Sequence, residues 1–139
     1  MNIPFEKQIW NDASQRSCGA AALSMIYTYL GLNISQKEIW NEISAPSATG
    51  GRSTKTHLIV RHALKHGLDA IAIKDRKPVF TTKRLVSAGI GLILNHRVKE
   101  NSPFGHYTVA VDYNKLGVFI HDPAVGRHRF ILDSKSTNS

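Results

Sequence analysis

The chain contains one cysteine, Cys18, in a position that favours reactivity. It follows a polar segment and begins a stretch, 18–30, whose apolar residues recur at helical spacing. Unpaired N–H groups and the dipole at a helix N-terminus stabilise a thiolate, which is the nucleophilic form of the side chain. Two interpretations are open from the position alone: a reactive nucleophile, or a buried, inert cysteine that packs as a small apolar residue.

A histidine and an aspartate in the C-terminal half favour the first interpretation. His106 begins an alternating segment, and Asp122 lies sixteen positions later, beyond a turn at 114–117. Two strands joined by this turn lie side by side, so the start of one comes near the end of the other. The carboxylate would then orient the imidazole, and the imidazole would act as the base for Cys18.

The segments around the cysteine are predicted to be helical. The helix at 18–30 contains a run of alanines, suits burial on most sides, and ends at Gly31. A second helix begins at Ser35, where Ser35 and Glu38 form a capping box. A loop is expected over 44–53 and a third helix over 54–66.

Beyond Gly67 the pattern changes to short segments typical of strands. Residues 68–74 alternate, and residues 80–87 are short and mixed. Four strands are predicted, with a hairpin turn before the third: 89–96, 105–113, 118–121 and 127–132. Helices followed by an antiparallel sheet define an α+β fold. We expect one domain over 1–133 and a polar tail over 134–139.

The composition limits the class of protein. Of the 139 residues, 42% are hydrophobic, which is enough for a core, and a single cysteine excludes an intramolecular disulfide. No segment has the pattern of a signal peptide, and no apolar stretch is long enough to span a membrane. We therefore expect no membrane partner, and a location in the cytoplasm or delivery into a target cell by a specialised secretion system.

The net charge of +8 would favour encounters with acidic partners. However, the basic residues are spread over 52–99 and 127–135, without the interleaved aromatic residues that stack on nucleic-acid bases. A solvated basic surface is therefore the favoured interpretation, and no nucleic-acid partner is expected. A nucleic-acid binder would instead show steeply salt-dependent binding that survives loss of Cys18.

Three motifs around the candidate residues resemble a known family. Residues 17–31 read SCGAAALSMIYTYLG, residues 105–111 read GHYTVAV, and residues 120–126 read IHDPAVG. In their order, and in the spacing between the last two, they are similar to the cysteine, histidine and aspartate motifs of the bacteriocin-processing, or double-glycine, cysteine peptidases. The resemblance extends from Ile3 to Leu132. It implies a papain-like fold, with N-terminal helices packed on a C-terminal antiparallel sheet.

The resemblance implies a role for each residue. Cys18 would attack the scissile carbonyl, and His106 would take the thiol proton and later protonate the leaving amine. Asp122 would orient His106. A glutamine would help the backbone N–H of Cys18 to bind the oxyanion.

The sequence departs from the family at this glutamine. Asp12 occupies the position at which the transporter-linked members carry it, and Ser17 precedes the cysteine where an aspartate is common. Gln8 is the preferred candidate, because stand-alone relatives often carry an extra loop between the glutamine and the cysteine. Gln15 is the alternative, but from there the chain would have to turn back sharply toward Cys18.

The resemblance also implies a substrate. The family cuts after paired glycines, so we expect a protein or peptide substrate that contains Gly-Gly, contacted by Gly19, Gly105 and Trp10. The sequence has no P-loop and no long apolar segment, which favours a free-standing peptidase over a transporter-fused one. It would act as an antibacterial effector on a cytoplasmic target, with a cognate immunity or inhibitor protein as a partner, or as a leader-peptide processing domain.

Other interpretations remain. A papain-like cell-wall peptidase or amidase uses the same order of cysteine and histidine, but the Asp-Pro-Ala turn at 122–124 argues against it. A non-catalytic peptide-binding relative would be expected to lack the cysteine or the histidine. No cofactor is expected. His62 and His66 share a helix face and could bind zinc, but the sequence shows no third ligand, so solvated or core histidines are favoured.

Overall fold

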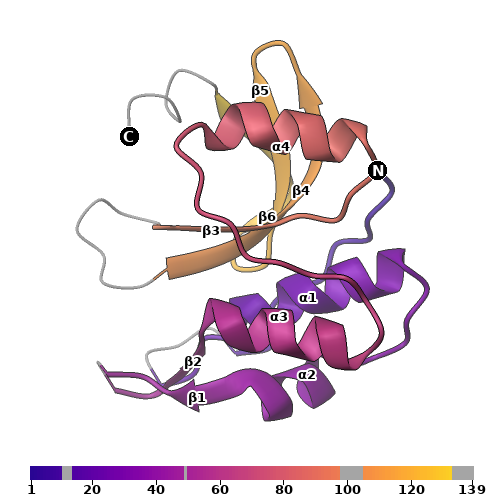
Figure 1. The fold of residues 1–139 in the computed structure, drawn as a ribbon. Coiled ribbons are helices and arrows are strands. Elements are labelled where there is room, and N and C mark those ends of the chain that lie inside the picture. The colour runs from indigo at the N-terminus through magenta and orange to yellow at the C-terminus, as the bar shows by residue number, and fades with distance from the viewer. Residues whose placement is uncertain (11–13, 49, 98–104, 133–139) are drawn as a thin grey trace.

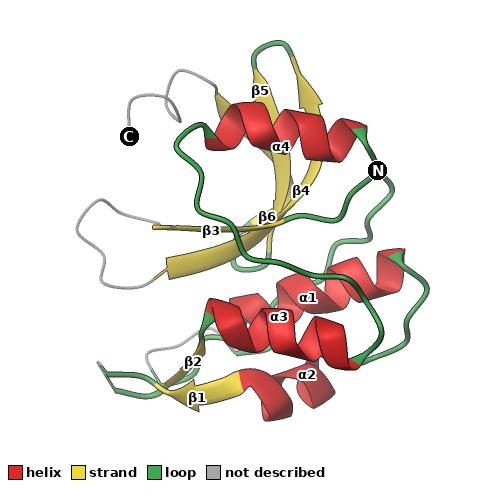
Figure 2. Ribbon diagram, viewed as in Figure 1, coloured by secondary structure: helices red, strands yellow, loops and turns green. Residues whose placement is uncertain are grey.

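The computed structural model describes residues 1–10, 14–48, 50–97 and 105–132, and it has the α+β architecture that the sequence predicts (Figures 1 and 2). The elements, in chain order, are α1 (Cys18–Tyr29), α2 (Gln36–Ile43), β1 (Ser44–Pro46), β2 (Arg52–Thr54), α3 (Thr56–Lys65), α4 (Pro78–Ser87), β3 (Ile93–Arg97), β4 (Gly105–Asn114), β5 (Gly117–Asp122) and β6 (Gly126–Leu132). The predicted tail lies outside the described residues.

Helix α1 is the centre of the N-terminal half. Residues 18–27 are all buried, because small side chains on several sides let α2, α3 and the sheet approach closely. The helix ends as predicted, with Gly31 in the left-handed region at φ 85°. Figure 1 shows α1, α2 and α3 gathered on one side of the molecule, with the larger sheet on the other.

The chain after α2 differs from the prediction. The cap at Ser35 is confirmed, since its Oγ accepts the N–H of Glu38 at 3.2 Å. The expected loop contains a two-stranded hairpin instead, in which β1 pairs with β2 and Ser44 lies opposite Thr54. Helix α3 therefore begins only at Thr56. The sequence predicted a loop here, but not that its two arms would pair.

The larger sheet is an antiparallel meander with the strand order β3-β4-β5-β6. The predicted turn between β4 and β5 is confirmed: Asn114 Oδ1 accepts the N–H groups of Leu116 and Gly117. Glycine is required at 117, because a Cβ there would lie 1.9 Å from the carbonyl oxygen of Ile131. This tight hairpin fixes the register that brings the start of β4 toward the end of β5.

The segment between α3 and β3 contains a helix that was not predicted. Residues 68–74 form no strand, and α4 spans Pro78–Ser87, where a short mixed segment was expected. Proline at the first helical position favours this start. The buried positions of α4 recur at helical spacing, and they are Val79, Thr82 and Val86. Alternation over 68–74 did not make a strand because no neighbouring strand pairs with it.

Helices cover both faces of the sheet (Figure 1). Val109 of β4 belongs to the core cluster around α1, whereas Ile120 of β5 packs with Val79 of α4. Ile120 lies opposite Ala110, the neighbour of Val109, and adjacent residues of a strand point to opposite faces. The sheet is therefore sandwiched between α1 and α4.

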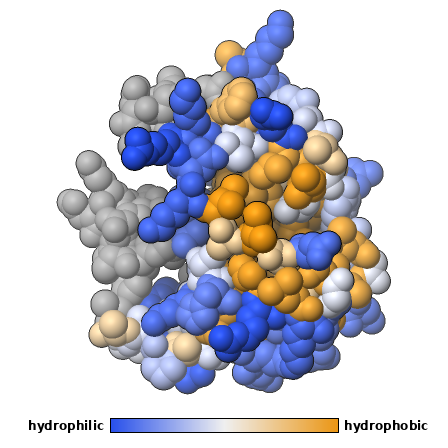
Figure 3. All heavy atoms as spheres, in the orientation of Figure 1, coloured by the Kyte–Doolittle hydropathy of each residue, from blue (hydrophilic) through white to orange (hydrophobic). Residues whose placement is uncertain are grey.

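Apolar side chains also gather on the surface, in the middle of the face drawn in Figure 3. Four exposed apolar residues lie in this part of the chain. Ile71 and Ile73 lie in the connection between α3 and α4, Phe80 lies in α4, and Ile90 lies after it. Within the described ranges, none of the helices has the length and apolar character needed to cross a membrane.

Candidate active site

Cys18 is the first residue of α1, as the sequence predicts, and its side chain is buried. Close packing positions this helix end. A Cβ on Gly19 would lie 2.7 Å from the Thr54 methyl group and 3.3 Å from the ring of Tyr107. Tyr107 follows His106 in β4, so the absence of a side chain at Gly19 lets the helix start approach the strand that carries the histidine. The first N–H groups of α1 have no partner within the helix.

His106 and Asp122 are brought together by the β4–β5 hairpin. Val109 lies opposite His121, which sets the start of β4 beside the end of β5. Nε2 of His106 and Oδ1 of Asp122 are 2.6 Å apart, and both side chains are largely buried, with 10% and 14% exposed. Because the bond is sheltered from water, the carboxylate can hold the imidazole in a fixed orientation.

Cys18 is near enough to His106 to act on the pKa of its imidazole, both as a hydrogen-bond partner and as a charge. Since Nε2 is bonded to Asp122, Nδ1 is the ring nitrogen left to interact with the sulfur. Burial acts to lower the pKa of His106. The hydrogen bonds to Asp122 and Cys18 and their negative charges outweigh it and raise the pKa to about 9. The imidazole is therefore protonated at neutral pH when it faces a thiolate.

Asp122 is held in its charged form. Burial acts to raise its pKa, but the hydrogen bonds from His106 and from the backbone N–H of Ala124 outweigh burial and lower the pKa. The Ala124 bond measures 2.9 Å and belongs to the turn after β5. The Asp-Pro-Ala sequence thus forms a local turn that keeps the carboxylate ionised beside the imidazole.

Gln8 lies between the two halves of this site. Its backbone N–H donates to the carbonyl oxygen of Pro123, next to Asp122, at 2.9 Å. Its side-chain Nε2 donates to the carbonyl oxygen of Trp10 at 2.9 Å, and the N–H of Ser17 donates to the same oxygen at 3.0 Å. The buried amide of Gln8 is therefore close to the start of α1, and its second N–H remains available as a donor.

Gln15 is arranged differently. Its Oε1 accepts a hydrogen bond from the indole N–H of Trp40 at 3.3 Å, and its backbone bridges to Arg52. The structure thus connects Gln8 with both the Asp122 turn and the start of α1. Asp12, which occupies the family's glutamine position, lies outside the described residues.

The three residues expected to contact substrate are placed as follows. Gly19 packs inside the fold as described above. Trp10 is half-buried with its ring against Trp40, at a centroid distance of 5.7 Å, and its carbonyl oxygen anchors Gln8 and Ser17. Gly105 pairs with Arg97 at the start of β4. Contact of these residues with a substrate remains a prediction.

The sequence analysis missed one residue that shapes the site. Gln36 is buried at the start of α2, and its Oε1 accepts the N–H of Ile9 at 2.7 Å and lies 3.1 Å from Ser17 Oγ. Its Nε2 donates to the Lys7 carbonyl and to Glu6. One side chain thereby holds the segment around Gln8 against the residue that precedes Cys18. No local sequence signal distinguishes this glutamine from a solvated helical residue.

Papain-like cysteine peptidases have a thiol at a helix N-terminus that faces an imidazole and a carboxylate from an antiparallel sheet. This scaffold has the same features. The sequence matches the Peptidase C39 family over residues 6–134. The fold is similar to the crystal structure of the peptidase domain of Streptococcus ComA, described as a bi-functional ABC transporter involved in a quorum sensing pathway. The TM-score is 0.75, with 19% sequence identity over 99% of this chain and 92% of that chain. No curated protein matches the sequence significantly.

The chain therefore belongs to the Peptidase C39 family, the double-glycine peptidases that its motifs resemble, and it is a cysteine peptidase.

Proposed function

We propose that the chain cleaves a protein or peptide substrate after a Gly-Gly pair, with Cys18 as nucleophile, His106 as acid and base, and Asp122 as the residue that orients His106. The observations that carry the proposal are the 2.6 Å hydrogen bond between His106 and Asp122 and the nearness of Cys18, which acts on the pKa of His106. Membership of the double-glycine peptidase family supports the position of the cut.

The first half of the reaction forms an acyl-enzyme. The thiolate of Cys18 attacks the carbonyl carbon of the second glycine, and the negative charge moves to the carbonyl oxygen. The backbone N–H of Cys18 and the remaining amide N–H of Gln8 donate to this oxyanion. When the tetrahedral intermediate collapses, the C–N bond breaks, and protonated His106 gives its proton to the leaving amine.

The second half releases the product. His106, now neutral, takes a proton from a water molecule, whose oxygen attacks the thioester carbon. The C–S bond then breaks, the sulfur leaves as the thiolate, and the carboxyl product departs. His106 is left protonated, which restores the starting state of the pair. Asp122 keeps the ring in place throughout, because its bond to Nε2 leaves Nδ1 as the nitrogen that exchanges protons.

A peptide panel tests the cut site. Matched peptides that differ only in Gly-Gly, Gly-Ala, Ala-Gly or Ala-Ala before the scissile bond are incubated with the full chain, and the products are identified by mass spectrometry. We expect cleavage of the Gly-Gly peptide and its loss with Cys18→Ala. Equal cleavage of all four peptides would reject the specificity but leave the peptidase mechanism standing.

Labelling of the thiol tests the pair itself. A small electrophile at pH 6–7 should modify Cys18 faster than a free cysteine, and His106→Ala should slow the reaction to the rate of an ordinary thiol. Equal labelling rates in the two proteins would contradict an activated pair. Circular dichroism of both proteins controls for folding.

The same cleavage would serve two biological roles, processing of a leader peptide or attack on a cytoplasmic target by a delivered effector. Structural similarity to a transporter's peptidase domain favours the first. Expression of the active chain and of Cys18→Ala in bacterial cytoplasm separates them: Cys18-dependent growth arrest supports the effector role and calls for a search for an immunity protein. Cleavage of purified double-glycine leader peptides without growth arrest supports processing.

A further inference from the structure

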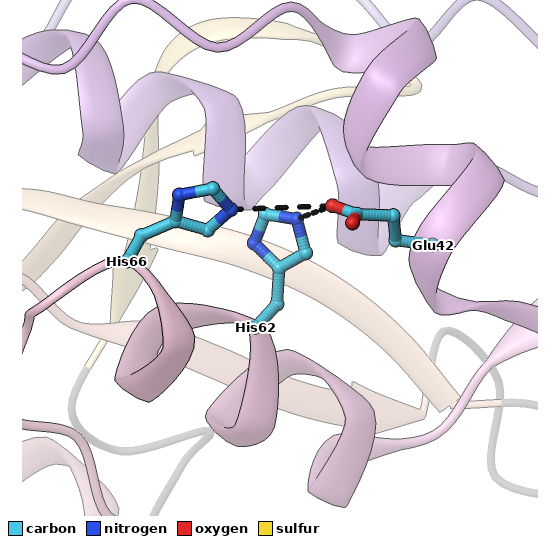
Figure 4. Close-up of side chains that lie close together, drawn as sticks. All are labelled: Glu42, His62 and His66. Carbon is cyan, nitrogen blue, oxygen red and sulfur yellow. Dashed lines mark hydrogen bonds and ion pairs between the residues drawn. The ribbon is translucent and has the colours of Figure 1, made fainter.

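Three potential metal ligands converge between α2 and α3, away from the Cys18 site (Figure 4). Glu42 lies in the last turn of α2, His62 lies in α3, and His66 is the C-terminal cap of α3. One ligand atom from each lies within 4.8 Å of the other two. The two histidines are the i, i+4 pair of the sequence analysis, and the fold supplies the third ligand that the sequence did not show.

The two oxygens of the Glu42 carboxylate face different partners. Oε1 accepts a hydrogen bond from Lys65 at 2.8 Å. Oε2 lies 2.5 Å from Nε2 of His62 and 4.0 Å from Nε2 of His66. Nε2 of His66 is buried and has no hydrogen-bond partner among the residues that the structure describes. One carboxylate oxygen and two imidazole nitrogens therefore point toward a common position, and one of these nitrogens is unsatisfied there.

A hydrogen bond at Nδ1, the ring nitrogen that does not face Glu42, orients the ring of His62. Its Nδ1 is hydrogen-bonded to the hydroxyl group of Tyr27 at 2.6 Å, and the two rings stack with their centroids 5.6 Å apart. Both side chains are buried. Histidines that bind metals almost always donate their second ring N–H to a hydrogen-bond acceptor, which fixes the tautomer. In this structure Nε2–H donates to the Glu42 carboxylate, so Nδ1 accepts a hydrogen bond from the Tyr27 hydroxyl. When a cation replaces the proton on Nε2, Nδ1–H can donate to the Tyr27 oxygen instead.

We propose that Glu42, His62 and His66 bind a zinc ion, with a water molecule at the fourth position. Two imidazole nitrogens and one carboxylate oxygen form a donor set that suits zinc. Ligand atoms of a tetrahedral zinc site lie about 3.3–3.6 Å apart, given bonds of about 2.0–2.2 Å. The observed spacings of 2.5 and 4.0 Å fall on either side of that range.

Side-chain adjustment is needed to reach zinc geometry, because the three ligand atoms lie only within 4.8 Å of one another. The Glu42 side chain is 41% exposed and can rotate its carboxylate, while His62 stays fixed by Tyr27. The ion takes the place of the proton that Glu42 and His62 share. It would join α2 to α3 and, through Tyr27, to α1, the helix that begins with Cys18.

The test is zinc binding by the purified, chelator-treated full chain in a Cys18→Ala background, which removes the other candidate zinc ligand. Calorimetric titration with Zn²⁺ should give one site per chain, and zinc should raise the melting temperature. His66→Gln and Glu42→Gln should each weaken binding at least tenfold. His57→Gln is the matched control, because His57 lies on the same helix, is exposed and is outside the cluster; it should bind as the parent does.

Two outcomes overturn the proposal. One is an absence of binding, or of any rise in melting temperature, at millimolar Zn²⁺ in the Cys18→Ala protein. The other is equal affinity in the parent, His66→Gln and Glu42→Gln proteins, which places the ion elsewhere. Circular dichroism confirms that each variant is folded. Co²⁺ gives an independent readout, since a tetrahedral site produces visible absorption that His66→Gln should abolish.

Discussion

Replacing Asp122 by asparagine removes a charge from the site while keeping its shape. Asparagine can still accept hydrogen bonds from His106 Nε2 and from the backbone N–H of Ala124, as Asp122 does. What it loses is the negative charge that opposes the effect of burial on His106. The variant therefore separates the electrostatic contribution of Asp122 from its positioning.

The expected magnitude follows from the pKa of His106. It is raised to about 9, although burial alone would lower it from 6.5. An opposite charge in contact shifts a pKa by about 1–3 units, so Asp122→Asn should bring the pKa of His106 to between about 6 and 8. At pH 8 the protonated share of His106 would then fall from about 90% to between about 1% and 50%.

The assay is kcat/KM for peptide cleavage between pH 6 and 10, since this quantity reports the ionisation of the free enzyme. Imidazolium is needed to protonate the leaving amine, so the alkaline limb of the wild-type profile should fall near pH 9. In Asp122→Asn it should move to lower pH, with a defect of about 2- to 100-fold at pH 8 that shrinks toward pH 6. Asp69→Asn, at an exposed position, should leave the profile unchanged.

A constant ratio of mutant to wild-type kcat/KM across the whole range would refute this reasoning. It would mean that Asp122 affects the rate without setting the protonation of His106. Loss of the fold is excluded separately by the melting temperature.

Three further changes test other contacts. Gln8→Ala should lower kcat about 100- to 1000-fold through loss of an oxyanion donor, which peptide kinetics measures. The rate at which an electrophile labels Cys18 should stay nearly unchanged in this variant. Gly19→Ala places a methyl group 2.7 Å from the Thr54 methyl group, so urea unfolding should show a loss of about 1–3 kcal/mol. Tyr27→Phe leaves Nδ1 of buried His62 without its partner and should cost about 1–3 kcal/mol in the same assay, measured with a chelator present.

Each of these changes has a control. Gln15→Ala should keep kcat within a few-fold, and an equal loss in Gln8→Ala and Gln15→Ala would count against the assignment of Gln8. Thr54→Ser removes the clashing methyl group, so adding it to Gly19→Ala should recover stability; no recovery would locate the strain elsewhere. Tyr113→Phe, on the exposed end of β4, should not change the unfolding free energy. A similar loss in that variant would show that the Tyr27 effect is not specific.

Much of the site follows from local sequence patterns. A lone cysteine at the start of a stretch with helical apolar spacing, and a tight turn midway between His106 and Asp122, are short-range features that depend on helix and hairpin geometry. Helix α1, the β4–β5 turn and the α+β class were therefore predictable. Helix α4 was not predicted because its apolar positions are few. Residues 68–74 alternate but form no strand, because an alternating segment becomes a strand only beside a pairing strand.

Other features depend on contacts between distant segments, which no local pattern encodes. The sequence determined which groups could do chemistry: one thiol, an imidazole and a carboxylate at the ends of adjacent strands. Only the tertiary structure decided that Gln8 joins the Asp122 turn to the start of α1, that Gln36 holds this segment in place, and that Glu42 meets His62 and His66. These contacts form where side chains meet in the packed core. Residues far apart along the chain can meet there, so a local sequence pattern does not reveal them.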